Sequence, residues 1–323
     1  MKFSGRIATV ASAALLLASS AGASLAENTK IRMGYIADYF GTSIAAIATE
    51  QKLWEKHGID AELKVFTNGP IQVQALGAGS LDFAYLGAGA MWLPASGKAK
   101  IIAVNALGLS DRVIAQKGIN SLADLKGKRI GIPEGTSGDM LYRLALEKAG
   151  LKRSDVETIK MDPSTVVSAF ASQQIDAAGI WYPLVGTIKS KVPGTVELAS
   201  NEDFYPEKSF PSAFVVSNEF SGNTEAVKKV NSVIKEALDF RAKNRELAVE
   251  ITAKFLGVDP EPLMQESAMA KVLNSDDLEF LTQNGNVYKW FGGLADLYVA
   301  FGKIEKAMDP KDYYLADLYL EAK

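Results

Sequence analysis

The sequence contains no cysteine and a single histidine, His57, among its 323 residues. Disulfide bonds are therefore excluded, and zinc, haem, iron–sulfur and cysteine-nucleophile chemistry lack the side chains that they commonly use. We interpret His57, in the segment QKLWEKHG, as a residue near the C-terminus of a helix that is capped by Gly58. Without disulfides the chain must be stabilised by a hydrophobic core.

Basic clusters are also missing. The formal net charge is −3, and lysine and arginine are spread along the chain rather than gathered in one block. Nucleic-acid binding depends on a basic patch that neutralises phosphates. We therefore expect no nucleic acid among the partners.

Long hydrophobic runs are absent after the first 26 residues. Lys2 and Arg6 precede a mostly apolar segment at 7–18, and Ser24-Leu25-Ala26 has the small residues of a cleavage site. The apolar segment is too short to span about 30 Å of hydrocarbon. The pattern predicts a secretory signal peptide over 1–26 rather than a membrane anchor. Removing it lowers the net charge to −5 and leaves enough chain for two domains.

Strand and helix patterns alternate through the first two thirds of the remaining chain. Alternation of this kind predicts an α/β fold with parallel sheets that are covered by helices on both faces. Strands are expected at 31–36, 61–66, 81–87, 100–107, 112–116, 129–132, 156–161 and 177–182. Helices are expected at 42–56, 70–78, 122–125, 138–149 and 166–173, and a helical stretch begins at Ala90.

The pattern changes after residue 218, where apolar residues recur three and four positions apart. This spacing predicts helices at 223–244, 245–256, 260–265, 276–284 and 287–300. The last third therefore cannot supply a second full sheet. The segments at 112–116 and 212–217 read as strands rather than as flexible linkers. This arrangement indicates a middle domain inserted into another through two crossings.

Four segments resemble substrate-binding proteins of the nitrate/sulfonate/taurine type, which serve ABC importers. They are GYIADYFGTSIAAIATEQKLWEKHGIDAELKVF at 34–66, GAGSLDFAYLGAGAMW at 77–92, SLADLKGKRIGIPEGTSGDMLYRLALEKAGL at 121–151 and QQIDAAGIWYP at 173–183. Together they span nearly all of the chain after the signal peptide, and they occur in the family's order.

The resemblance implies a bilobed fold of the periplasmic-binding-protein type (type II), in which two α/β lobes are joined by a two-strand hinge and bind ligand between them. Lobe one would comprise 27–112 and 216–323, and lobe two 113–215. The family also implies a monomeric, periplasmic protein without a cofactor, metal or catalytic residues. Its partners would be a small molecule and the permease and ATPase of an inner-membrane importer.

The turn GTSGD at 135–139 lies between an expected strand and an expected helix. Ligands of open parallel sheets bind beyond the carboxyl ends of strands, where helix N-termini present free N–H groups. We expect Thr136, Ser137 and Gly138 to contact ligand, although either hydroxyl can instead cap the helix. Asp139 suits the first turn of the helix and is also a candidate partner for a cationic group. The lysine of a P-loop is absent.

Two further turns are candidates in lobe one. Gly87 and Ala88, in the small-residue turn GAGA, can offer backbone amides to a ligand or allow close packing of strand on helix. Tyr39 and Phe40 can wall a pocket. Asp38 can receive an ammonium group, or it can cap the helix that follows. Taurine-binding members of the family have an acidic residue in this turn, which implies an amine-bearing ligand.

Aromatic residues follow the expected strand at 177–182. Trp181 and Tyr182 can form a wall of the cleft or can pack in the core, and the family places the matching tryptophan beside the ligand. Phe210 precedes the second hinge strand and can close over the ligand. Asp176 more often holds the start of its strand in place.

The nature of the ligand stays open at this point. Taurine, or another sulfonate that carries an amine, is the leading expectation. Two acids near the pocket would repel a plain anion, and none of the four turns contains an arginine that could clamp one. A cationic or neutral nitrogen compound, such as a guanidine compound or a pyrimidine, is therefore the alternative.

An enzyme of the same superfamily, similar to the pyrimidine synthases of thiamine biosynthesis, is a less favoured interpretation. Those enzymes need a cysteine-rich segment and an active-site histidine, whereas this chain has no cysteine and His57 lies outside the candidate turns. A binding protein that serves a sensor instead of an importer is not distinguished by the sequence.

Overall fold

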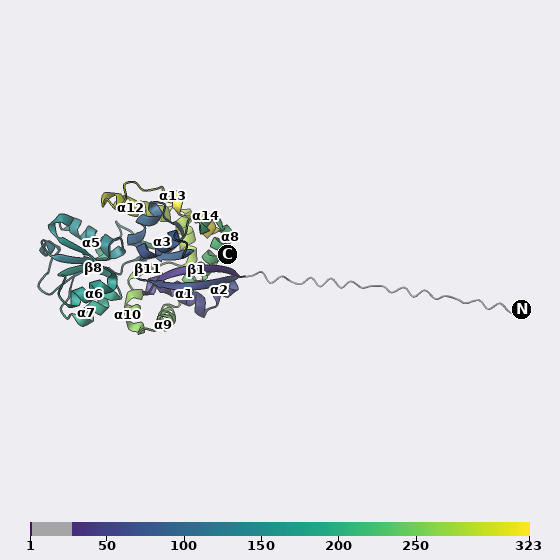
Figure 1. Ribbon diagram of the computed structural model, residues 1–323, viewed down its shortest axis with the longest axis horizontal. Helices are drawn as coiled ribbons and strands as arrows, with labels where there is room; N and C mark the ends of the chain where they lie inside the picture. The colour runs from purple at the N-terminus through teal and green to yellow at the C-terminus, as the bar shows by residue number, and fades with distance from the viewer. Residues whose placement is uncertain (2–27) are drawn as a thin grey trace.

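The computed structural model describes Met1 and residues 28–323, so the expected signal peptide lies outside the described residues. Figure 1 shows two α/β halves side by side, one around β1 and α1 and the other around β8, α5 and α6. The strands form a six-stranded sheet in the order β11-β4-β10-β3-β1-β2 and a five-stranded sheet in the order β7-β6-β8-β5-β9. This two-sheet architecture confirms the bilobed α/β prediction.

The larger half contains the first and last parts of the chain. Its strands are β1 (Thr29–Ile36), β2 (Ile59–Phe66), β3 (Phe83–Leu86), β4 (Lys100–Gly108), β10 (Pro211–Val216) and β11 (Ala270–Val272). Its helices are α1 (Tyr39–Glu50), α2 (Leu53–Lys56), α3 (Gly69–Gly77), α4 (Trp92–Ala95), α8 (Thr224–Lys243), α9 (Arg245–Leu256), α10 (Pro260–Ser267), α11 (Ser275–Gln283), α12 (Asn286–Ala300), α13 (Pro310–Tyr313) and α14 (Ala316–Leu320). Short 3-10 turns are η1 (Ala88–Ala90) and η5 (Phe220–Gly222).

The smaller half is built from the middle of the chain. Its strands are β5 (Asp111–Ala115), β6 (Arg129–Ile132), β7 (Glu157–Lys160), β8 (Ala177–Trp181) and β9 (Val196–Ser200). Its helices are α5 (Ser137–Lys148), α6 (Pro163–Ala171) and α7 (Leu184–Lys191), with 3-10 turns η2 (Leu122–Leu125), η3 (Arg153–Asp155) and η4 (Asn201–Asp203). Every residue of β5 and β8 is buried, because helices pack on both faces of this sheet.

Two expectations about the elements were wrong. The sheets are mixed rather than parallel, because β10 runs antiparallel to β3 and β4, and β5 runs antiparallel to β8 and β9. The helix expected at 42–56 is divided, since Lys52 has φ 54° between α1 and α2. The helical last third supplies one short strand, β11, to the edge of the larger sheet, which agrees with the expectation that it forms no second full sheet.

The chain crosses between the sheets twice. The first crossing is the short connection from β4 to β5, and the second runs from the end of β9 to the start of β10. The expected lobe boundary at 215/216 falls inside β10, which pairs entirely within the larger sheet. A lobe boundary before residue 211 therefore describes the sheets better, because the connection from β9 ends where β10 begins.

Candidate functional site

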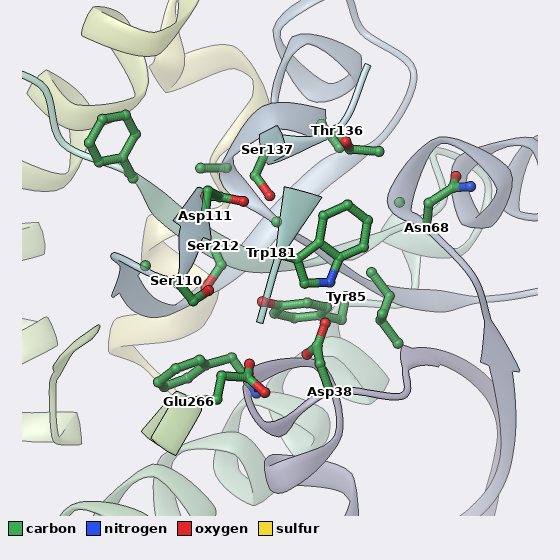
Figure 2. Close-up of a pocket in the computed structure, with 18 residues that line it drawn as sticks. Asp38, Asn68, Tyr85, Ser110, Asp111, Thr136, Ser137, Trp181, Ser212 and Glu266 are labelled. Carbon is green, nitrogen blue, oxygen red and sulfur yellow. Dashed lines mark hydrogen bonds between the residues drawn. The ribbon is translucent and has the colours of Figure 1, made fainter. Parts of the chain in front are cut away.

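A cavity of about 50 Å³ lies where the two halves meet. Its walls come from the carboxyl ends of strands in both sheets, from the first turn of α5 and from α10 (Figure 2). This is the position at which open α/β sheets bind ligands. The lining residues are Ile36, Asp38, Phe40, Asn68, Gly69, Tyr85, Gly87, Ala88, Ala90, Gly108, Ser110, Asp111, Thr136, Ser137, Trp181, Phe210, Ser212 and Glu266.

Eight of the twelve candidate residues line this cavity, although contact with a ligand stays a prediction. They are Asp38, Phe40, Gly87, Ala88, Thr136, Ser137, Trp181 and Phe210. They come from five separate segments of the chain, and the fold brings them together because each segment follows or precedes a strand at the same edge.

The other four candidates have structural partners elsewhere. Tyr39 is buried behind the cavity, with its ring edge-on to Phe40 at 5.1 Å between centroids. A Cβ atom at Gly138 would meet the Gly179 carbonyl oxygen at 2.4 Å, so this glycine allows α5 to pack closely on β8.

Asp139 and Tyr182 are held by polar partners in the smaller half. The Asp139 carboxylate accepts a hydrogen bond from the Gly135 amide at 2.9 Å and pairs with the Arg143 guanidinium at 3.0 Å. The Tyr182 hydroxyl donates to Glu197 at 3.2 Å. The two side chains therefore serve local structure, and neither lines the cavity.

The cavity also contains polar and aromatic residues that sequence reasoning missed. They are Asn68, Tyr85, Ser110, Asp111, Ser212 and Glu266. Tyr85 and Asn68 lie at the ends of β3 and β2, where the rule of strand ends would have found them. Ser110 lies in the first crossing, and Asp111 is the first residue of β5. Glu266 belongs to a helix more than 220 residues away from Asp38, and no local pattern indicated it.

Asp38 both caps α1 and faces the cavity. Its Oδ1 accepts a hydrogen bond from the Gly41 amide at 2.6 Å, and the side chain is buried. The indole nitrogen of Trp181 points toward this carboxyl (Figure 2). Burial raises the pKa of Asp38 to about 7, and the nearby Asp111 adds to the increase. A positively charged ligand would favour the ionised form.

Asp111 has a carboxylate oxygen without a partner. Its Oδ1 is buried and makes no hydrogen bond within the described structure. Its backbone amide is fixed by the Asn201 side chain at 2.8 Å, so the residue is held in place while that oxygen stays free. Burial raises the pKa of Asp111 to about 6. A buried acceptor without a partner is costly, and a donor on a ligand would satisfy it.

Glu266 contributes a third carboxyl group to the cavity wall. One oxygen accepts a hydrogen bond from the Tyr39 amide at 2.8 Å and the other from the Phe40 amide at 3.4 Å. The side chain is almost completely buried. Burial raises the pKa of Glu266 well above its ordinary value, with a further contribution from Asp38.

Basic side chains are missing from the lining. Among the residues that the structure describes, no lysine, arginine or histidine lines the cavity. The buried guanidinium of Arg241 lies on the Phe40 ring at 5.6 Å and bonds Ser43 and Asn105 instead. Within the same residues, no group of three histidine, cysteine, aspartate or glutamate side chains is arranged to hold a metal ion.

The turn GTSGD is mostly occupied by its own hydrogen bonds. The Thr136 hydroxyl donates to the Pro133 carbonyl at 2.6 Å, and the Asp139 carboxylate accepts a hydrogen bond from the Gly135 amide. Ser137 remains the polar side chain of this turn that faces the cavity, opposite Asp111 in Figure 2. Gly135 has φ 78°, a conformation that favours glycine.

Comparisons with known proteins place the chain in a family. The model of the NMT1/THI5 like family matches residues 42–248. A protein of Brucella abortus, described only as a candidate binding protein, is 66% identical over 91% of this chain and 93% of its own length. The taurine-binding periplasmic protein of Escherichia coli is 28% identical over 42% of this chain and 43% of its own.

A solved structure supports the same fold. The crystal structure of the periplasmic aliphatic sulphonate binding protein from Escherichia coli aligns with a TM-score of 0.68 at 20% identity, covering 91% of this chain and 99% of the other. The chain therefore belongs to the NMT1/THI5 like family and has the fold of type II periplasmic binding proteins. The resemblance to the nitrate/sulfonate/taurine type is confirmed.

Proposed function

We propose that this protein is the periplasmic solute-binding component of an ABC importer and that it captures a small solute bearing a positively charged nitrogen. The observation that carries the proposal is the cavity between the halves, where Asp38 and Asp111 face the space and no basic side chain lines it. Carboxylates in a poorly solvated site bind a cation strongly because little water screens the interaction. A plain anion such as nitrate would meet repulsion there.

Binding would need no covalent chemistry. Asp38 and the free Oδ1 of Asp111 would accept N–H groups from the ligand. The rings of Phe40, Tyr85 and Trp181 would cover its less polar surfaces. Closure of the two halves would bury the solute and present a surface to the permease.

An amine-bearing sulfonate such as taurine is the second candidate. It is favoured by the first turn of α5, where Ser137 can donate to an anionic group, and by the similarity to the taurine-binding protein. In that arrangement the amine would bind the carboxyls of the larger half and the sulfonate would face α5.

The cellular setting follows from the same proposal. Residues 1–26 would direct export, and the released protein would act as a monomer with an inner-membrane permease and ATPase. In the described part of the chain, no helix has the length and apolar character needed to cross a bilayer.

Thermal unfolding in the presence of single solutes tests the proposal. A panel should include taurine, alkyl sulfonates, nitrate, alkylammonium ions, guanidine compounds and pyrimidines. A solute that binds only the folded protein raises its stability by ~2.7 kcal/mol at a hundred times its Kd. We expect a shift with a solute that carries a cationic nitrogen. A shift with nitrate alone, or with no solute, would contradict the proposal.

A further inference from the structure

The first turn of α1 is already neutralised by the protein's own carboxyl groups. The N-terminal amides of a helix are free to bind an anion unless side chains occupy them. In α1 the Gly41 amide donates to Asp38, and the Tyr39 and Phe40 amides donate to Glu266. An acidic group of a ligand would find these donors taken on this side of the cavity.

Glu266 reaches the first turn of α1 from a different helix, α10. It lies near the end of α10, and its side chain extends to the start of α1 in the lining of the cavity (Figure 2). None of the ion pairs among the described residues includes Glu266, so the backbone amides are its polar partners. The carboxyl group therefore occupies the place that an anionic ligand group would take.

We infer that Glu266 determines specificity by filling the anion-accepting end of the larger half, so that the cavity selects a compact organic cation without an acidic group. This inference rests on the proposed function and narrows its ligand class to alkylammonium, amidinium or guanidinium ions. Asp111 of the smaller half also lines the cavity, and its buried Oδ1 lies without a partner. A cation would then contact carboxyl groups from both halves.

The remaining lining fits such an ion. Phe40, Tyr85, Trp181 and Phe210 supply aromatic surfaces that attract a cation and exclude water. A cavity of about 50 Å³ suits a small solute. The buried Arg241 lies behind Phe40 and bonds the Asn105 side chain, and the buried Arg112 bonds Glu197 and the Leu109 carbonyl, so neither lines the cavity as a direct partner for an anion.

Four ligands of related size test the inference by isothermal titration calorimetry on the purified protein. Ethylammonium, taurine and ethanesulfonate share a two-carbon chain and differ only in which charged groups they carry, and guanidinium adds a planar cation. The variants are Glu266→Gln, which keeps an acceptor for the Tyr39 amide, and Glu261→Gln, an exposed control on the same helix.

For the wild-type protein we expect ethylammonium or guanidinium to bind and ethanesulfonate not to bind, with taurine weaker than the pure cations. Glu266→Gln should weaken cation binding by roughly tenfold or more, because the negative charge beside the poorly solvated cavity is lost. The same variant should bind taurine relatively better, whereas Glu261→Gln should match the wild type. A change in preference between ligands reports specificity, since a purely structural defect would weaken all of them alike.

Two results would overturn the inference. Wild-type protein that binds taurine or ethanesulfonate at least as tightly as the cations would reject it while leaving the solute-binding function in place. The inference would also be rejected if the Glu266→Gln variant bound the four ligands in the same order, and with the same ratios of affinity, as the wild type. If none of the wider panel binds, the proposed function fails as well, so the two failures are distinguishable.

Discussion

At the scale of single residues, Trp181 connects the two halves of the site. It ends β8 in the smaller sheet, and its indole faces Asp38 of the larger half across the cavity. Trp181→Ala should weaken solute binding by roughly tenfold to a hundredfold, in the range that aromatic truncation causes at binding hot spots. Ligand should also change the intrinsic fluorescence of the wild type and less that of the variant. Affinity that is unchanged in Trp181→Ala would remove this residue from the site.

Replacing Asp111 should weaken solute binding without lowering the stability of the empty protein. Asp111→Asn removes a carboxylate that is buried and partly unsatisfied, so the empty protein should be at least as stable as the wild type. Cation binding should nevertheless weaken by about tenfold or more, because the amide cannot provide the charge. Denaturant unfolding and calorimetry measure the two effects. Loss of stability together with unchanged binding would assign Asp111 a structural role.

Asp38 tests how a ligand amine is held. If it pairs with that amine, Asp38→Asn should weaken the binding of both ethylammonium and taurine by roughly tenfold or more, because the charge that holds the amine is lost. Asparagine caps a helix about as well as aspartate, so the stability of the empty Asp38→Asn protein should change little through the cap, whereas Asp38→Ala should lose about 1 kcal/mol of stability. Calorimetry with both ligands distinguishes the two roles. Unchanged affinity for both ligands would show that the residue is only a cap.

At the scale of elements, the backbones of the two halves approach each other so closely at one point that only glycine fits there. A Cβ atom at Gly89 in η1 would lie 2.0 Å from the Thr136 carbonyl carbon, which precedes α5. Trp92 donates to the Gly135 carbonyl at 3.2 Å beside this contact. Neither Gly89 nor Trp92 lines the cavity, so this contact sets how far the halves close without touching a ligand.

Gly89→Ala should therefore disfavour the closed arrangement and weaken solute binding by roughly tenfold, because a smaller fraction of molecules is competent to bind. Gly77→Ala in α3 is the matched control, since its Cβ would meet nothing within 4 Å. Calorimetry gives the affinity, and small-angle X-ray scattering with ligand gives the degree of closure. Equal affinity and equal radius of gyration in both variants would show that the contact is not needed for closure.

Sequence reasoning located elements well where the pattern was local. Strand ends and helix starts were found because apolar runs, glycines and cap residues are read within one segment, and eight candidate residues reached the cavity. The strand-start role of Asp176 was also visible, and the structure places it on Arg129 by backbone and side chain. Asp82 repeats this arrangement with Arg32 in the larger sheet.

What depends on distant contacts could not be found from the sequence. Glu266 reaches the cavity only because α10 packs near the start of α1, and Asp139 turns back to Gly135 because Arg143 lies one turn later. The direction of β10 is likewise set by the return of the chain from the smaller half. Such placements are determined by tertiary packing, on which local propensity carries no information.

At the scale of the whole molecule, three buried carboxyl groups in one cavity link stability to pH. The pKa of Asp38 is raised to about 7 and that of Asp111 to about 6, from an ordinary value of 3.8. Between the ordinary pKa and these raised values, the folded protein binds more protons than the unfolded chain. The free energy of unfolding therefore falls as pH rises through this window. A bound cation would oppose the fall, because it favours the ionised groups.

We expect the empty wild-type protein to lose roughly 2–3 kcal/mol of stability between pH 5 and pH 7.5 relative to Asp38→Asn, given about 1.4 kcal/mol for each pKa unit. Cation affinity should change in the opposite sense and increase over the same interval, since ionised carboxyls bind the ligand and protonated ones do not. Urea unfolding at both pH values, with wild type and variant compared, measures the first effect, and calorimetry measures the second. If the stability difference between wild type and variant stays constant with pH, Asp38 is not protonated in the empty cavity in this range, and its titration cannot account for a pH dependence of binding.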